Sequence, residues 1–159
     1  MQNKTVRIII LSILLIGSGF AQTGPKLDIK IAEEKVNISD EERNSGIISY
    51  APLDTILYTL TSTNIGDALM TNPVITDPIP AGVRYVLDSA EGQNSKILYS
   101  IDGGKKYAEW PVYYSVRNAR GIVVRKEASA DMVTHVRWEI QNNLEAGAVN
   151  VSKLKVVVK

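Results

Sequence analysis

The stretch Ile56-Leu57-Tyr58-Thr59-Leu60-Thr61 sets the pattern for the whole chain. Its first, third and fifth residues are large and apolar, and the positions between them carry one leucine and two threonines. An alternation of period two predicts a β-strand with one face buried, and aromatic and β-branched side chains favour the same pleated surface. We therefore expect a half-buried strand over residues 56–61.

The same alternation recurs along most of the chain after Gly24-Pro25. It predicts further strands with their apolar residues at Leu27, Ile29 and Ile31; Val74 and Ile75; Val83, Tyr85 and Leu87; Ile97, Tyr99 and Ile101; Val136, Trp138 and Ile140; and Leu154, Val156 and Val158. Short antiparallel strands separated by Gly, Pro, Asn and Asp are typical of β-sandwiches. We expect an all-β, antiparallel, immunoglobulin-like β-sandwich of about seven to nine strands.

Turn and loop signals divide these strands. Asp102-Gly103 favours a tight hairpin turn, and Pro78 and Pro80 end the strand that begins at Val74. No segment has a convincing helical period, although residues 33–35 and 40–44 are polar enough for a loop or a single helical turn. Residues 38–52 and a longer insertion at 110–133 are expected to be irregular.

The length of 159 residues suits one domain preceded by a short leader. Lys4 and Arg7 precede an apolar run over residues 8–16, and small residues up to Ala21 follow. This order is typical of a cleaved signal peptide, and the run is too short for a membrane-spanning helix. We expect residues 1–21 to be the signal peptide, 22–52 a strand and loop that join the sandwich, and 53–159 its core; an uncleaved anchor is the alternative.

Composition narrows the classes of function. The chain has no cysteine and a single histidine, which excludes disulfides, cysteine nucleophiles and cysteine-based zinc sites. Its formal net charge is +1, and removal of Lys4 and Arg7 leaves a slightly acidic chain, so nucleic-acid binding is not expected. An exported domain without disulfides indicates a bacterial periplasm, cell envelope or cell surface, with no membrane span after signal cleavage.

Several segments in a fixed order resemble a known family. They are the Tyr-Thr strand with Asn64-Ile65-Gly66-Asp67, the run Asp77-Pro78-Ile79-Pro80-Ala81-Gly82, Val136-Arg137-Trp138, Leu144-Glu145-Ala146-Gly147, and a valine-rich last strand. Together they resemble the bacterial conserved repeat known as domain of unknown function eleven, over roughly residues 53–159. The resemblance implies an immunoglobulin-like module on a secreted or surface protein, with a structural or adhesive role rather than a catalytic one.

The signature residues have structural explanations that need no ligand. Gly66 and Gly82 are expected to adopt backbone angles that other residues avoid, and Trp138 to fill the space between the sheets. Asn64 and Asp67 are expected to bind amides of their own loop. Asp77 is expected to accept hydrogen bonds from N–H groups near Pro78 and Pro80.

Two alternatives give some of these residues chemistry. Asn64, Asp67, Asn72 and Asp77 offer hard oxygens to calcium, although their spacing matches no EF-hand loop. Lys30 and Asn150 have the order of an intramolecular isopeptide bond, with Glu139 or Asp54 as the acid. Lys30 alternates with apolar neighbours, however, and should point away from the core.

The insertion carries the strongest candidates for a binding surface. Its aromatic and basic residues suit contacts with sugars, peptides or anionic groups, and they are Trp110, Tyr113, Tyr114, Arg117, Arg120 and Arg125. The alternative is that Trp110 and Tyr114 pack in the core and the charges stay solvated. His135 alternates with Val136 and Trp138, so it should face solvent, and no catalytic motif is present.

We therefore expect no enzyme activity and no cofactor. The expected function is that of an exported structural or adhesive module. The alternative is a periplasmic or secreted protein that binds a carbohydrate or protein partner through the insertion.

Overall fold

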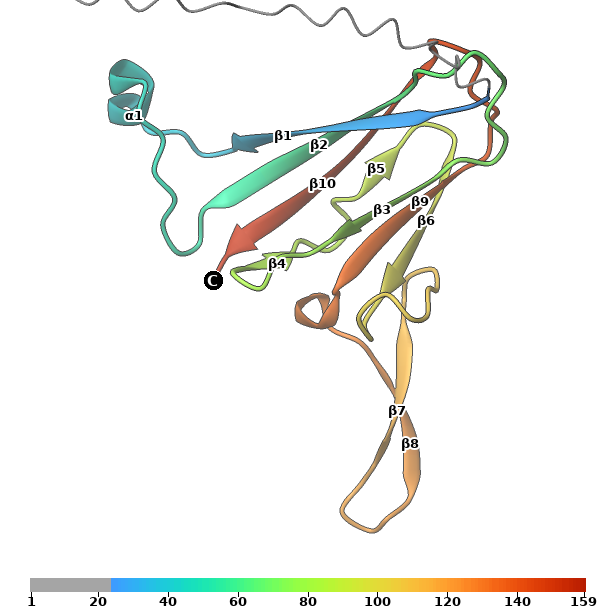
Figure 1. The fold of residues 1–159 in the computed structure, drawn as a ribbon. Helices are drawn as coiled ribbons and strands as arrows, with labels where there is room; N and C mark the ends of the chain where they lie inside the picture. Colours follow the sequence, from blue (N-terminus) through green and yellow to red (C-terminus); the bar gives the residue numbers. More distant parts are fainter. Residues whose placement is uncertain (1–23) are drawn as a thin grey trace, which may run out of the picture.

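The computed structural model describes residues 24–159, so the expected signal peptide lies outside the described residues. The described chain is all-β apart from two short helices (Figure 1). In chain order the elements are β1 (Leu27–Lys35), α1 (Asp40–Ser45), β2 (Thr55–Asn64), β3 (Val74–Pro78), β4 (Val83–Tyr85), β5 (Glu91–Gly92), β6 (Ser95–Ser100), β7 (Tyr113–Arg117), β8 (Val123–Glu127), the 3-10 helix η1 (Ala130–Met132), β9 (His135–Ile140) and β10 (Val149–Val158).

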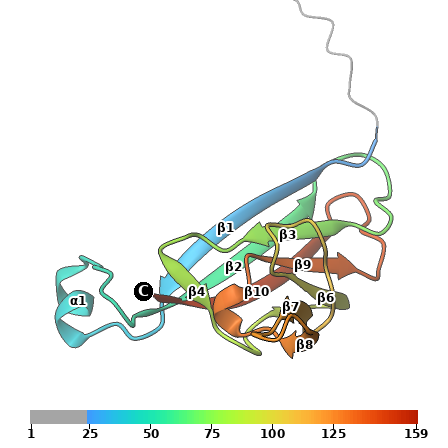
Figure 2. The same cartoon turned by 90° about the horizontal axis from the view of Figure 1, so that it is seen from below.

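The strands form two layers and a separate ribbon. The larger sheet has the order β1-β2-β10-β4, with β5 also paired to β10, and the smaller sheet has the order β3-β9-β6. Every pairing is antiparallel. Among the described residues, β7 and β8 pair only with each other; they extend away from the two layers in Figure 1, and Figure 2 views them end-on.

The core lies between the two sheets. In β2 the residues Ile56, Tyr58 and Leu60 are buried while their neighbours are half-exposed, as the alternation predicts. They belong to one cluster with Trp138 of β9, which is completely buried. The indole N–H of Trp138 donates to the carbonyl of Glu91 at 2.9 Å, so the expectation that this ring fills the space between the sheets is confirmed.

The strand boundaries differ from expectation in three places. Residues 33–35 continue β1 instead of forming a loop, β4 ends at Tyr85 so that Leu87 is exposed, and the two-residue β5 was not foreseen. The insertion at 110–133 is also not irregular, because it contains β7, β8 and η1. The two main sheets of the described residues hold five and three strands, which is within the seven to nine expected, and the ribbon adds two more.

The short helix α1 is defined by its ends. Ser39 accepts a hydrogen bond from the amide of Glu42, and the Glu42 carboxylate accepts one from the amide of Ser39, which is a capping box. Gly46 ends the helix at a φ of 69°, a conformation that favours glycine. Residues 40–44 thus form the single helical turn that was one of the two expectations. Within residues 24–159 no helix is long and apolar enough to cross a bilayer.

Candidate functional site

The β7–β8 ribbon is the element that carries most of the candidate binding residues. Its register runs from Tyr113 opposite Glu127 to Arg117 opposite Val123. The loop at its tip is held by Asn118, whose side chain accepts hydrogen bonds from the amides of Arg120 and Ile122. The result is a two-stranded finger that extends away from the two sheets (Figure 1) and contacts the core only at its base, through Tyr114.

One face of the ribbon joins an aromatic ring to basic and apolar side chains. The Arg125 guanidinium lies 3.8 Å from the centre of the Tyr113 ring, a cation–π contact between neighbouring positions of the two strands. Val123 and the adjacent Ile122 are each 56% exposed. The ribbon, residues 113–127, includes four basic side chains and one acidic side chain, Glu127 at its base. An exposed surface that is both apolar and positive is a candidate for contact with a partner.

The six expected binding residues fall into two groups. Trp110 packs its edge against Tyr99, with ring centres 5.7 Å apart, and Tyr114 is half-buried against the core. Tyr113, Arg117, Arg120 and Arg125 lie on the ribbon and are exposed. Trp110 and Tyr114 therefore follow the core alternative, and the other four form the surface that we call the ribbon surface, together with Ile122 and Val123.

A hollow of about 690 Å³ lies at the base of the ribbon. It is lined by Tyr99, Ile101, Asp102, Lys106, Tyr107, Ala108, Val112, Tyr113, Tyr114, Ser115 and Met132. Asp102 accepts hydrogen bonds from the amide of Lys106 and the hydroxyl of Ser100, which lower its pKa and fix the loop after β6. The Arg137 guanidinium lies 3.5 Å from the centre of the Tyr107 ring. Two of the lining tyrosines therefore already carry a guanidinium on one ring face.

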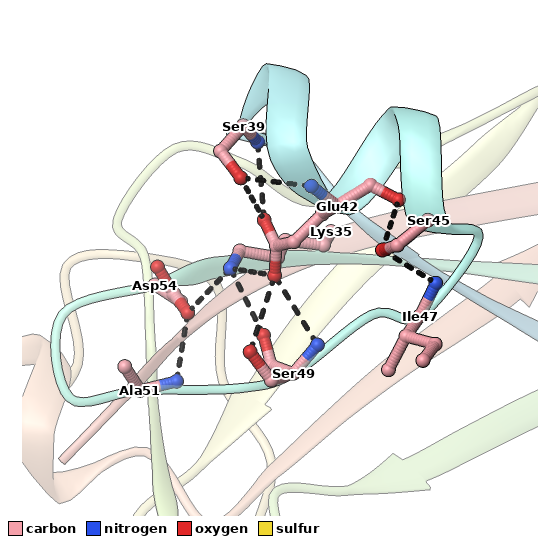
Figure 3. Close-up of polar contacts among 8 residues, drawn as sticks. All are labelled: Lys35, Ser39, Glu42, Ser45, Ile47, Ser49, Ala51 and Asp54. Carbon is pink, nitrogen blue, oxygen red and sulfur yellow. Dashed lines mark hydrogen bonds and ion pairs between the residues drawn. The ribbon is translucent and has the colours of Figure 1, made fainter.

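A second polar cluster surrounds Lys35 at the end of β1 (Figure 3). Its ammonium lies 2.8 Å from Glu42, 3.0 Å from Asp54 and 2.9 Å from the carbonyl of Ser49, and its side chain is 7% exposed. The hydrogen bond from Lys35, with those from the amides of Ser39 and Ser49, holds the pKa of Glu42 at about 2. Because all three donors of Lys35 have acceptors, this cluster fastens the segment 36–54 to the sheet.

The pKa values of the other two members also shift so that the charged form of each is favoured. The hydrogen bonds from Lys35 to Glu42 and then to Asp54 raise the pKa of Lys35. The amide of Ala51 and then Lys35 lower the pKa of Asp54. Sequence reasoning missed the cluster, although Lys35 occupies an inward position of the β1 alternation and Ser39 and Glu42 have capping-box spacing.

The four calcium candidates do not converge. The Asn64 side-chain oxygen already accepts from the amides of Lys26 and Gly66, each at 3.1 Å, and Asp67 accepts from the amide of Gly24. Asn64 thus binds an amide of its own loop at Gly66, as expected, whereas Asp67 binds the amide of Gly24, which lies before β1 and outside the loop of Asp67. Asn72 precedes β3, whereas Asp77 lies roughly 10 Å along that strand from its first residue.

The expected reason for glycine at positions 66 and 82, an unusual backbone angle, is wrong. Neither Gly66 nor Gly82 has a positive φ. Gly66 is instead required by close approach, because a Cβ there would overlap the carbonyl oxygen of Gly24 and lie 2.6 Å from the amide nitrogen of Lys26. A Cβ at Gly82 would meet open space.

Asp77 also differs from its expected role. Among the described residues no N–H donates to its carboxylate, so it does not satisfy the groups near Pro78 and Pro80. It faces inward on the edge strand β3, and burial raises its pKa to about 6.

The isopeptide alternative is excluded by the faces of the strands. Asn150 is buried on the inward face of β10, whereas Lys30 is exposed on the outward face of β1 and pairs with Thr61. His135 lies on the outward face of β9, as expected, with its ring nitrogen 3.1 Å from Thr134. Within residues 24–159 no three acidic or histidine side chains gather closely enough to hold a metal ion.

Compared with protein-family models, curated proteins and solved structures, the chain matched none of them. The resemblance to the conserved repeat therefore stays a prediction, and the function has to be argued from the ribbon surface and its surroundings.

Proposed function

We propose that this protein is a non-catalytic, exported β-sandwich module of the immunoglobulin-like kind, with a structural or adhesive role at the bacterial cell envelope or surface. It acts by holding the β7–β8 ribbon away from its two sheets and presenting the ribbon surface to a partner. The proposal extends the expectation from sequence, because it assigns the contact to one element.

The proposal rests on the exposed position and the side chains of the ribbon. The two strands contain no fully buried residue and contact the core only at Tyr114, yet they place two apolar side chains near the tip, each 56% exposed. Exposed apolar side chains grouped with arginine are characteristic of contact surfaces. The short connection to the core, where the amide of Ala128 donates to the carbonyl of Val112 at 2.8 Å, fixes the base of the ribbon.

Charge reversal at the ribbon tests the proposal. Purified protein is mixed with isolated envelopes of the producing bacterium, and the fraction that sediments with them is measured. The double variant Arg120→Glu/Arg125→Glu should lose at least about tenfold in binding, because the contact depends on positive charge. The control Lys155→Glu reverses an exposed charge on β10 and should bind normally. Equal binding by both variants and the wild type would reject the ribbon as the contact element.

The location is tested separately by cell fractionation. We expect the mature chain to begin at Gln22 and to appear outside the cytoplasm. A cytosolic product that retains residues 1–21 would contradict the export part of the proposal.

The hollow at the ribbon base favours a second candidate, a protein that binds a carbohydrate. Tyrosines line it, and aromatic faces suit sugar rings. Titration calorimetry with soluble oligosaccharides would decide, with Tyr107→Ala as the variant expected to lose binding. The contacts of Tyr107 and Tyr113 with arginine occupy part of the stacking surface, so we rank this function second.

A further inference from the structure

Strand β1 exposes a face that the rest of the larger sheet buries. Ile29 and Ile31 lie directly opposite Ser62 and Leu60 of β2, on the inward side of the sheet. Ser62 and Leu60 are 0% and 1% exposed, whereas Ile29 and Ile31 are 42% and 54% exposed. The smaller sheet has three strands and does not cover β1, which lies at the margin of the two layers (Figure 1).

The backbone of β1 is open on the same side of the molecule. Within the described residues β1 pairs only with β2. The carbonyl of Lys26 accepts from the amide of Ile65, and the amide of Val36 donates to the carbonyl of Thr55. The backbone N–H and C=O groups of the even-numbered residues of β1 therefore point toward β2. Antiparallel pairing alternates, and the N–H and C=O groups of Ile29, Ile31 and Glu33 therefore point away from the sheet. Such an edge can accept another strand.

Charge distinguishes this edge from the ribbon. The segment from Asp28 to Asp54 holds seven acidic and three basic side chains, whereas the ribbon, residues 113–127, holds four basic side chains and one acidic one. Figure 1 shows the ribbon at the end of the molecule opposite β1 and α1. A contact between them within one copy is therefore not formed.

The side chains of β1 and β8 are also complementary. On β1, apolar Ile31 and acidic Glu33 are two residues apart on one face. On β8, apolar Val123 and basic Arg125 are two residues apart on one face. A strand from one element laid beside the other can bring apolar to apolar and basic to acidic side chains.

We propose that the β7–β8 ribbon of one copy docks along β1 of a second copy. This inference rests on the proposed function, because it names the partner of the ribbon surface. Donor and acceptor occupy different places on the chain, so the contact is heterologous and joins copies head to tail. The expected product is a head-to-tail assembly of several copies.

The association is tested by sedimentation velocity of the purified protein over a range of concentrations. At about 20 mM NaCl the wild type should form species that grow with concentration, and about 500 mM NaCl should weaken them because salt screens the charges. The acceptor variant Glu33→Lys/Glu34→Lys and the donor variant Arg120→Glu/Arg125→Glu should each stay monomeric. The controls Glu145→Lys and Lys155→Glu should associate like the wild type.

Mixing the two variants gives the sharpest result. The acceptor variant retains its basic ribbon and the donor variant retains its acidic β1 edge, so an equal mixture should associate although neither variant does alone. The charge-reversed ribbon and the charge-reversed edge also have opposite charges, so the mixed species can grow beyond one-to-one complexes. Restored association also shows that both variants are folded. Association of either variant alone at the wild-type level, or no association in the mixture, would overturn the proposed contact.

One outcome separates this inference from the proposed function. If the wild type stays monomeric at low salt but binds envelopes through the ribbon, a second copy is not the partner and the proposed function stands. If the wild type neither associates nor binds envelopes, both fail.

Discussion

Trp138 and Gly92 depend on each other at the centre of the core. A Cβ at Gly92 would lie 2.6 Å from the Trp138 ring, so the two-residue strand β5 has to approach the indole without a side chain. The approach also brings the carbonyl of Glu91 to the indole N–H. The buried ring thereby fastens β5, on the larger sheet, to β9 on the smaller one.

Asp77 makes stability depend on pH. Its pKa is raised to about 6 by burial, so its neutral form is favoured in the folded state. A carboxyl whose pKa is raised on folding favours the fold below its unfolded pKa, and that contribution is lost as the pH rises through about 6. We expect Asp77→Asn to increase the free energy of unfolding by about 1 kcal/mol at pH 8, allowing for its partial exposure, and by nothing at pH 4.

Urea denaturation of wild type and variant at the two pH values measures this difference. The exposed Glu145→Gln is the control and should behave like the wild type at both. An unchanged or lower stability of Asp77→Asn at pH 8 would show that the carboxylate makes favourable contacts.

Trp110 and Tyr113 lie three residues apart and should respond differently to truncation. Trp110→Ala removes a ring that packs against Tyr99 and should cost about 2 kcal/mol of stability. Tyr113→Ala removes an exposed ring with one arginine contact and should cost no more than about 1 kcal/mol. Thermal unfolding measures both, and a larger loss for Tyr113→Ala would place that ring in the core.

At the scale of elements, the segment 36–54 depends on the Lys35 cluster. Glu42 has its pKa lowered to about 2, so its contribution is present above its unfolded value near 4.5 and is lost as the pH falls toward 2. Glu42→Gln should therefore loosen the segment at pH 7, because Lys35 loses its nearest anion. Cleavage by trypsin after Arg43 in native protein should accelerate several-fold.

The matched control for this element is Glu41→Gln, which changes an exposed neighbour in α1. It should be cleaved at the wild-type rate. Equal cleavage of both variants would mean that Lys35 and Asp54 hold the segment without Glu42.

How far each element was predictable follows from what its side chains bury. Strands such as β2 and β9 alternate because one face meets the core, and sequence reasoning found them. The ribbon has no fully buried residue, and the adjacent apolar residues in Tyr113-Tyr114 and Val123-Val124 obscure the alternation of its short strands. Its two halves were recognised as aromatic and basic, but not as strands.

The candidate site was predictable only in its residue types. Aromatic and basic residues of the insertion pointed to a surface, yet the division between Trp110 in the core and Tyr113 on the ribbon depends on tertiary packing. The exposure of Ile29 and Ile31 could not be predicted from the sequence either, because it also depends on tertiary packing. Their alternation predicts a buried face, and only the width of the opposite sheet leaves it uncovered.

The whole molecule combines a rigid two-layer body with two outlying contact regions. The core cluster draws residues from both sheets, and most of the exposed positive charge of the insertion lies on the ribbon. The β1 edge and segment 36–54 carry the opposite charge. The residues that stabilise the fold are therefore largely different from those of the ribbon surface, since the ribbon contributes to the core only at its base.

Removal of the ribbon tests that separation most directly. Tyr114 packs against the core and pairs with Lys126, so residues 115–125 can be replaced by an Asn-Gly turn that joins these two positions as a tight hairpin. The shortened protein should unfold within about 1 kcal/mol of the wild type and lose its binding to envelopes. Retained binding, or loss of the folded state together with the ribbon, would contradict the account.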